Sequence, residues 1–162
     1  MDIYAFLEQH DVAYERTDHP PVFTCEQAER LVPAMAGADT KNLFVRDKKG
    51  KNHFLVIVGY EKSVNLKLLS RDLGVSGLSL GSADRLQTHL GIDAGSVSLL
   101  AIVNDGASLV DVVIDKKLWL ADRWKCHPLI NTSTLSIKRT DVERILNITN
   151  HSYRVIEVPA KQ

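Results

Sequence analysis

Residues 42–58, NLFVRDKKGKNHFLVIV, decide the fold class of this chain. Residues 42–46 and the apolar run 53–58 have the composition of strands, and the polar segment between them contains a turn glycine, Gly50. The pattern predicts a β-hairpin whose second strand is well buried, because a continuous apolar run offers no polar face to water. We therefore expect the fold to be built around a sheet.

The sequence before this hairpin predicts two helices and one strand. Ile3, Phe6 and Leu7 recur at helical spacing and predict a short first helix, and residues 12–16 follow as a brief strand. Residues 24–27, TCEQ, form a capping-box pattern in which the threonine and glutamine side chains satisfy free amides at a helix start. We expect this second helix to end before Pro33.

The sequence after the hairpin adds elements of both kinds. Two short helices are predicted to end at Gly74 and Gly91, the second capped by Ser82, with a strand or turn at residues 78–80 between them. Strands are predicted at residues 99–103, 109–114 and 132–137, and residues 153–158 should form a closing edge strand. A capping box at residues 140–143 predicts a last helix through Leu146.

These elements predict a mixed α/β (α+β) fold with a mixed, partly antiparallel β-sheet flanked by short helices. Strict alternation of strands and helices is absent, which argues against an all-parallel sheet. The chain has 162 residues and neither repeats nor a linker, so a single domain spanning residues 1–162 is predicted.

Composition places the chain among globular proteins. Its residues are 44% hydrophobic and 25% charged, close to the roughly 45–50% and 25% of ordinary soluble domains, which excludes disordered and fibrous classes. No apolar run approaches the roughly 18 residues of a membrane-spanning helix, and the first residues lack a signal-peptide pattern. We expect a cytoplasmic protein with no membrane partner.

Charge is distributed unevenly along the sequence, although twenty basic residues balance twenty acidic ones. Residues 41–71 contain eight basic and two acidic residues, whereas residues 72–115 contain one basic and six acidic residues. Two solvent-exposed surfaces of opposite charge, without a functional role, would explain this distribution. A partner rich in phosphate is the functional alternative.

Several common catalytic and metal-binding motifs are absent from the sequence. Cys25 and Cys126 lie far apart and outside any paired-cysteine motif, which indicates free thiols rather than a disulfide framework or a zinc site. The sequence contains no P-loop, no G-x-G-x-x-G, no H-E-x-x-H and no G-x-S-x-G. The enzyme classes that depend on those motifs are therefore excluded.

Three segments combine polar side chains with turns in a way that packing alone does not require. They are residues 40–42, TKN, residues 95–98, GSVS, and residues 127–132, HPLINT. Taken singly, they also fit a solvated strand end, a turn and a loop corner.

Together with residues 19–24, HPPVFT, and the pair Asn104-Asp105, these segments resemble the YbaK/ProX-type aminoacyl-tRNA deacylases. This family comprises free-standing relatives of the editing domain inserted in bacterial prolyl-tRNA synthetases. The resemblance covers almost the whole chain and is greatest to the ProX branch, also called PrdX. It implies the editing-domain fold and a hydrolase that deacylates mischarged tRNA in trans, without a metal or an organic cofactor. The implied substrate is Ala-tRNA(Pro), and prolyl-tRNA synthetase is an implied partner.

Editing of this kind has a physical basis. A synthetase pocket built for proline cannot strongly exclude alanine, because each missing methylene group costs only about 1–3 kcal/mol. A second pocket sized for alanine would reject proline by overpacking. We expect residues 19–35 to line such a small apolar cavity.

The resemblance also implies roles for individual residues. Lys41 matches a lysine that is essential in the family, and we expect it to hold the phosphate or ester group of the terminal adenosine and to favour developing negative charge. His127 is expected to act as a general base or only to orient water and substrate. The basic residues around Lys41 are expected to meet acceptor-stem phosphates. The residues expected to bind substrate are Asn42, Phe23, Gly95, Ser96, Ser98, Asn131 and Thr132.

One position departs from the family pattern. The family loop usually reads Gly-x-x-x-Pro, whereas this chain has Leu99 at the proline position, and leucine does not fix φ. Cysteine or serine attached to tRNA therefore stay open as substrates. A non-catalytic module that binds tRNA or a synthetase is a further alternative, and an unrelated α/β domain is the third.

Overall fold

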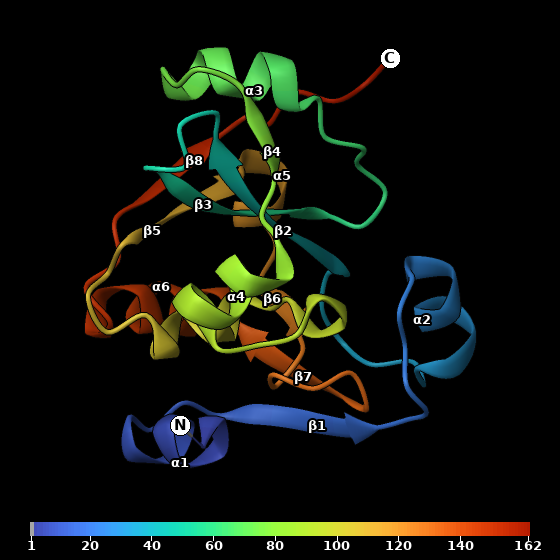
Figure 1. Ribbon diagram of the computed structural model, residues 1–162. Helices are drawn as coiled ribbons and strands as arrows, with labels where there is room; N and C mark the ends of the chain where they lie inside the picture. The colour runs from blue at the N-terminus through green and yellow to red at the C-terminus, as the bar shows by residue number, and fades with distance from the viewer. Residues whose placement is uncertain (1) are drawn as a thin grey trace.

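Two β-sheets form the framework of the protein in the computed structural model, which describes residues 2–162 (Figure 1). The larger sheet has the strand order β4-β2-β3-β5-β8, and the smaller one has the order β1-β7-β6. The strands of the larger sheet are β2 (Thr40–Asp47), β3 (His53–Gly59), β4 (Leu78–Leu80), β5 (Val110–Asp115) and β8 (Tyr153–Ile156). The strands of the smaller sheet are β1 (Tyr14–Asp18), β6 (Arg123–Cys126) and β7 (Ser133–Lys138).

The predicted hairpin is confirmed as the pair β2 and β3. The two strands are antiparallel, with Thr40 opposite Gly59 and Arg46 opposite His53. β4 pairs antiparallel with the far end of β2, whereas β3 with β5 and β5 with β8 are parallel. The predicted fold class, a mixed and partly antiparallel sheet with short helices, is therefore confirmed. The chain divides its strands between two sheets, where the sequence predicted one.

Short helices flank these sheets. They are α1 (Ile3–Gln9), α2 (Cys25–Leu31), α3 (Leu66–Leu73), α4 (Ala83–Leu90), α5 (Lys116–Trp119) and α6 (Arg139–Ile148), with 3-10 helices η1 (Ala94–Ser96) and η2 (Leu99–Asn104). The predicted caps of α4 are present: the Ser82 hydroxyl accepts from the Arg85 amide, and Gly91 ends the helix in the left-handed region. Among residues 2–162, no helix could span a membrane.

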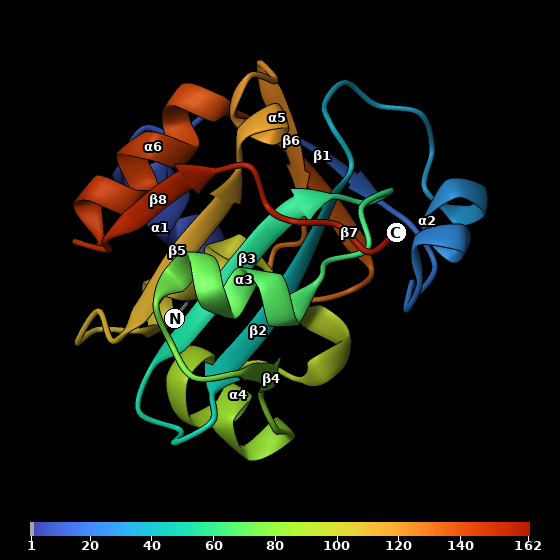
Figure 2. The same ribbon diagram turned by 90° about the horizontal axis from the view of Figure 1, so that it is seen from above.

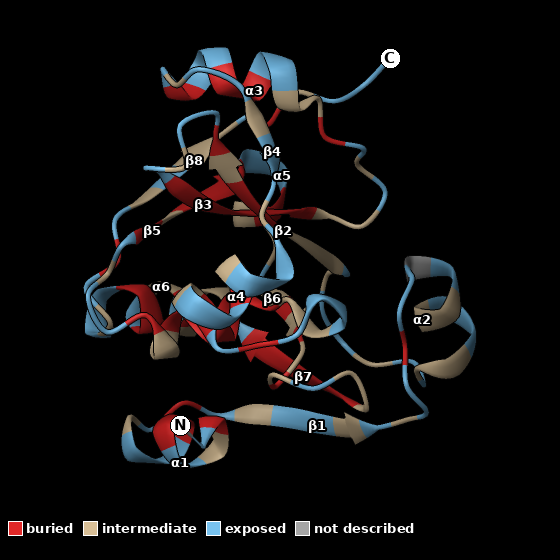
Figure 3. Ribbon diagram, viewed as in Figure 1, coloured by how far each residue is buried: buried red, intermediate tan, exposed pale blue. Residues whose placement is uncertain are grey.

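Two apolar cores lie on opposite faces of the larger sheet. On one face, Val45, Phe54 and Val56 pack with α3, and on the other, Phe44 and the residues around it pack against the smaller sheet. Figure 1 shows α3 beyond one face and the smaller sheet with α1 beyond the other, and Figure 3 shows buried residues concentrated in β3 and β7. Because strand side chains alternate, Lys41 shares the α3 face of β2 with Val45, whereas Thr40, Asn42 and Phe44 share the other.

The strand predicted at residues 99–103 is wrong, because this segment forms η2. Leu99, Leu100 and Ile102 are all buried in the main core. An apolar run without periodicity does not distinguish a buried strand from a buried helical turn. The Ser98 hydroxyl decides the outcome locally, because it accepts from the Leu100 amide and caps the turn.

The capping box predicted at residues 140–143 is also wrong. α6 begins at Arg139, directly after β7, and its N-cap Lys138 makes no side-chain capping bond. The Arg139 amide instead donates to the Asp122 carbonyl at 2.8 Å, so a neighbouring loop satisfies it. Thr140 consequently lies inside the helix.

Candidate functional site

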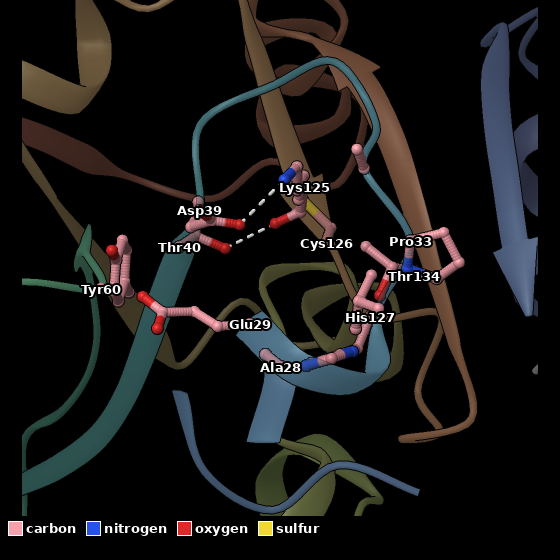
Figure 4. A pocket seen from close by; sticks show the side chains of 12 residues that line it. Ala28, Glu29, Pro33, Asp39, Thr40, Tyr60, Lys125, Cys126, His127 and Thr134 are labelled. Atoms are coloured by element: carbon pink, nitrogen blue, oxygen red, sulfur yellow. Dashed lines mark hydrogen bonds and ion pairs between the residues drawn. The ribbon is translucent and has the colours of Figure 1, made fainter. Parts of the chain in front are cut away.

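A pocket of about 320 Å³ opens between α2, the first residues of β2 and the end of β6 (Figure 4). Ala28, Val32 and Ala34 give it a wall of small apolar side chains. Thr40, Thr134 and His127 contribute polar groups. The cavity expected from residues 19–35 is therefore present, with its contribution limited to residues 28–34.

The capping box predicted at residues 24–27 positions the apolar wall. The Thr24 hydroxyl accepts from the Gln27 amide at 3.1 Å, and the Gln27 side chain accepts from the Phe23 amide at 2.8 Å. α2 ends at Leu31, before Pro33, as expected. The chain then returns to β2 through Ala38, whose amide and carbonyl bond the backbone of β6. α2 is thereby held over the end of the smaller sheet.

An ion pair and a hydrogen bond join the rim of the pocket to β6. Lys125 Nζ lies 3.0 Å from Asp39 Oδ1, and the Thr40 hydroxyl donates to the Lys125 carbonyl at 2.6 Å (Figure 4). The charges of Asp39 and Lys125 largely cancel. Thr40 of the larger sheet and Lys125 of the smaller sheet are thus fixed side by side.

His127 follows β6 and is part of the pocket wall. Its Nδ1 lies 3.3 Å from the Ser133 carbonyl, and its own carbonyl accepts from the Ser98 hydroxyl at 2.6 Å. Burial lowers the pKa of His127, and nearby His19 lowers this pKa further, against an opposing contribution from the Ser133 carbonyl. The imidazole is therefore mainly neutral near pH 7 and can accept a proton.

Cys126 lines the pocket beside His127 and is not a nucleophile at neutral pH. Burial raises the pKa of its thiol to about 12, so it stays protonated. Its thiol is free, as the sequence predicted. The same prediction for Cys25 lies outside the described side chains.

Three distant segments that hold predicted substrate-binding residues contact one another beside the pocket, but none of these predicted residues is among the described residues that line it. Phe23 is 68% exposed, and a Cβ added at Gly95 would lie 3.3 Å from its Cδ1, so the ring covers this glycine closely. The Asn131 carbonyl accepts from the Val22 amide. The Thr132 carbonyl likewise accepts from the His19 amide at 2.9 Å. Ser96 lies one residue beyond Gly95, at the end of η1.

Lys41 is not brought together with His127 in this arrangement. It lies on the α3 face of β2, is absent from the residues that line the pocket, and its ammonium donates to the Lys62 carbonyl. Lys62 in turn pairs with Asp115 at 3.0 Å. The predicted catalytic pair is therefore divided between the two faces of the sheet.

Asn42 lies on the pocket side of β2, two residues beyond Thr40. Its Oδ1 is buried and has no hydrogen-bond partner among the described residues. A buried polar atom without a partner is costly, and such atoms are rare in folded proteins. Asn42 is not among the residues that line the pocket, so this orphaned acceptor lies beside the pocket wall and not in it.

Similarity to known proteins identifies the class of this site. The family model described as "Aminoacyl-tRNA editing domain" matches residues 19–145, which include every pocket residue. The chain belongs to this family. The predicted class, an aminoacyl-tRNA deacylase of the editing type, is confirmed at this level.

The editing domain also has close relatives over its full length. It is 33% identical to the prolyl-tRNA editing protein ProX of Acetoanaerobium sticklandii over 96% of this chain and 95% of that protein. It is 34% identical to prolyl-tRNA synthetase associated domain-containing protein 1 of Danio rerio, over 93% and 83% of the two chains. A solved structure of a candidate trans-editing enzyme for prolyl-tRNA synthetase has a TM-score of 0.70 at 16% identity, covering 99% and 96%, and shares the fold.

The departure from the family loop has a structural explanation in this editing domain. Leu99 is the first residue of η2, directly after the N-cap Ser98. Proline is favoured at this helical position because its missing amide needs no partner there. Leucine occupies the position with its side chain fully in the core, and Ser98 holds the loop through two hydrogen bonds.

Several pocket residues of the editing domain were not predicted from the sequence. β6 is only four residues long, and its pattern Arg-Trp-Lys-Cys is too short to predict a strand by alternation. Lys125, which lies on this strand, was therefore not predicted to line the pocket. Glu29 and Tyr60 come from a helix and a loop that approach each other only in the folded chain. No local signal marks them, because exposed glutamate and tyrosine are common in helices and loops.

Proposed function

We propose that this editing domain hydrolyses Ala-tRNA(Pro) in trans and so removes alanine mistakenly attached to proline tRNA. The observation that carries the proposal is a pocket that His127 lines together with the small apolar side chains of Ala28 and Ala34. The similarity to the prolyl-tRNA editing protein ProX supports the choice of tRNA. We propose the cytoplasm as the place of action and prolyl-tRNA synthetase as the source of the substrate.

The size of the apolar wall favours alanine over proline. Ala28 and Ala34 leave room for a methyl group, and the pocket as a whole must also hold the ester and part of the terminal ribose. The ring of proline adds methylene groups that would press on Val32 and α2, and overpacking of that kind costs about 1–3 kcal/mol. Discrimination by size is the physical requirement of a second sieve.

The reaction is attack of water on the ester carbonyl. The new C–O bond forms as the water loses a proton, the bond to the ribose oxygen breaks, and that oxygen takes up a proton to leave alanine and a free hydroxyl group. We propose that neutral His127 accepts the proton from water or orients the water through its ring. Asn42 and the loop containing Gly95, Ser96 and Ser98 would hold the aminoacyl end.

Lys41 is proposed to stabilise the negative charge of the intermediate after a change of rotamer. β4 pairs with β2 only at residues 45–47, so the strand edge beside Lys41 is open. Its ammonium has one partner, the Lys62 carbonyl, among the described residues. A long side chain held by one contact can turn around an open strand edge at little cost. The substrate phosphate or ester would draw it toward the pocket.

The basic turn of the hairpin is a proposed contact for the acceptor stem. Lys48, Lys49 and Lys51 are exposed there, and the acidic Asp47 between the strands is buried. Figures 1 and 2 show this turn and α2 at opposite ends of the sheet, so the pocket and the turn are well separated. Binding through phosphates should weaken steeply as salt is raised.

The test is a deacylation assay with purified protein and alanyl-, cysteinyl-, seryl- and prolyl-tRNA(Pro). We expect rapid loss of the alanyl ester, slow loss of the prolyl ester, and strong impairment in His127→Ala and Lys41→Ala. Hydrolysis of none of the four esters would overturn the proposed function and favour a binding module. A cysteinyl or seryl preference would correct the substrate, and full activity in Lys41→Ala would remove that residue from the mechanism.

A further inference from the structure

We propose that Glu29 binds the α-ammonium group of the aminoacyl ester and so makes the pocket selective for esters with a free amino group. The inference rests on the proposed function and adds the chemical group that is recognised. It assigns a specificity role to α2, an element to which the sequence assigned only the wall of the cavity.

The charge balance of the pocket is the first argument. Two carboxylates, Glu29 and Asp39, line the pocket or its rim, and Asp39 is paired with Lys125 at 3.0 Å. No ion pair among residues 2–162 includes Glu29. His127 adds no compensating charge near pH 7, because burial lowers its pKa. The pocket thus has one carboxylate without an ion-pair partner, on an exposed residue of its wall, and favours a ligand group that is positive.

The position of Glu29 is the second argument. It extends from α2 on the side of the pocket opposite His127, toward Tyr60, as Figure 4 shows. Its carboxylate is close enough to the Tyr60 phenol to raise the pKa of that group. The two carboxylate oxygens offer about four acceptor sites, so a contact with Tyr60 leaves capacity for an ammonium group.

The geometry of an aminoacyl ester fits this arrangement. The α-carbon carries the ammonium group on one bond and the carbonyl on another, so the two groups must point in different directions. An ammonium group held at Glu29 would direct the carbonyl across the pocket toward His127. A charge-assisted hydrogen bond of this kind is stronger than one between neutral groups and fixes orientation. Glu29 would therefore be a specificity and positioning residue.

The experiment compares alanyl-tRNA(Pro) with lactyl-tRNA(Pro), in which a hydroxyl group of similar size replaces the ammonium group. The proteins are wild type, Glu29→Gln, and the control Glu26→Gln, which alters an exposed glutamate of α2 that does not line the pocket. We expect Glu29→Gln to lower kcat/KM on the alanyl ester on the order of 10-fold to 100-fold. The lactyl ester should be unaffected, and Glu26→Gln should match wild type on both.

A second measurement separates this inference from the proposed function. Binding of the non-hydrolysable analogues, with an alanyl or lactyl amide in place of the ester, requires no catalysis. Preferential loss of alanyl-amide binding in Glu29→Gln would support ammonium recognition even if no ester is cleaved. Equal losses on both ligands would assign Glu29 a structural role and overturn the inference, as would no loss on either. Failure of wild type to hydrolyse alanyl-tRNA(Pro), with binding selectivity intact, would remove only the deacylation.

Discussion

The two ends of the β2–β3 hairpin differ in how completely their polar groups are satisfied. At the turn, the buried Asp47 carboxylate accepts from the Lys51 amide, the Asn52 amide and the Asn52 side chain at 2.8–3.1 Å. At the other end, Asn42 Oδ1 is buried without a partner among the described residues. We call the turn the closed end of the hairpin, because its buried carboxylate is fully hydrogen-bonded. We call the end that contains Asn42 the open end, because a buried acceptor there has no partner among the described residues.

Backbone conformation shows the same contrast. Gly50 in the turn has a φ of 70°, which glycine adopts without strain. Leu129, in the loop next to His127, has a φ of 67°, although a leucine side chain makes this region unfavourable by about 1–2 kcal/mol. Leu129 thus adds strain next to His127, as expected where a site is maintained for a ligand at a cost in stability, and Asp11, Ser108 and Asn150 adopt positive φ elsewhere in the chain.

The largest effect should come from His127→Ala at the open end. We expect a loss of activity on the order of 100-fold or more, because a general base contributes about that much. In wild type, the rate should rise with pH through the lowered pKa of His127, so the midpoint of the rise should lie below the ordinary histidine value of 6.5. Rate measurements from pH 4.5 to 8 would check this, and an unchanged acid limb in the variant would contradict it.

Asp47→Ala tests the closed end. We expect the melting temperature to fall by several degrees with kcat unchanged, because three donors lose their acceptor far from the pocket, and any change in activity should be confined to KM for tRNA. Asn52 and the neighbouring amides lower the pKa of Asp47. This stabilisation is complete above the unfolded pKa and is lost as pH falls toward the folded pKa. The difference between variant and wild type should therefore shrink in acid, and a difference that grows below pH 4 would argue against the assignment.

Asn42→Leu tests whether the open end is a compromise between stability and function. Replacing an orphaned buried acceptor by an apolar group of similar size should raise the free energy of unfolding by about 1 kcal/mol. Activity should fall tenfold or more if Asn42 holds the substrate. Denaturant unfolding and deacylation rates measure the two quantities. Loss of both stability and activity would mean that an ordered water satisfies Oδ1.

The smallest effects should come from substitutions at two positions of positive φ, where a glycine gains a side chain and a leucine loses one. Gly50→Ala should cost about 1 kcal/mol with kcat unchanged, because φ is positive and the new Cβ would lie 2.6 Å from Arg85 Nη2. Leu129→Gly should change stability little, since relief of strain offsets lost packing, yet lower activity by loosening the loop. Gly106→Ala, with open space around its Cβ position, is the neutral control in unfolding experiments.

Local patterns predicted the elements that local interactions define. The cap at Thr24 and the glycines that end α3 and α4 depend on residues within one turn of each other, and the hairpin joins two strands that are consecutive in the sequence. The predictions failed where a distant group decided the outcome. The amide of Arg139, for example, is satisfied by Asp122 rather than by a capping side chain.

The sequence predicted few members of the candidate site, because His127 is the only predicted site residue that lines the pocket in the described part of the chain. The motifs containing Phe23, Gly95 and His127 were identified from the sequence, and the structure places these segments together. Lys41 and His127 were both predicted to be catalytic, but the alternation of side chains along β2 puts Lys41 on the face that packs with α3, away from the pocket. No local sequence pattern marked Glu29 as a residue of the pocket.

The sequence by itself determined the fold class and the family, because periodicity, caps and the spacing of motifs are properties of short segments. Only the tertiary structure decided which groups share a cavity and which remain unpaired. Burial and charge compensation depend on contacts between residues far apart in the chain, such as Asp39 with Lys125 and Thr40 with the Lys125 carbonyl. The unpaired carboxylate of Glu29 becomes visible only after those contacts are known.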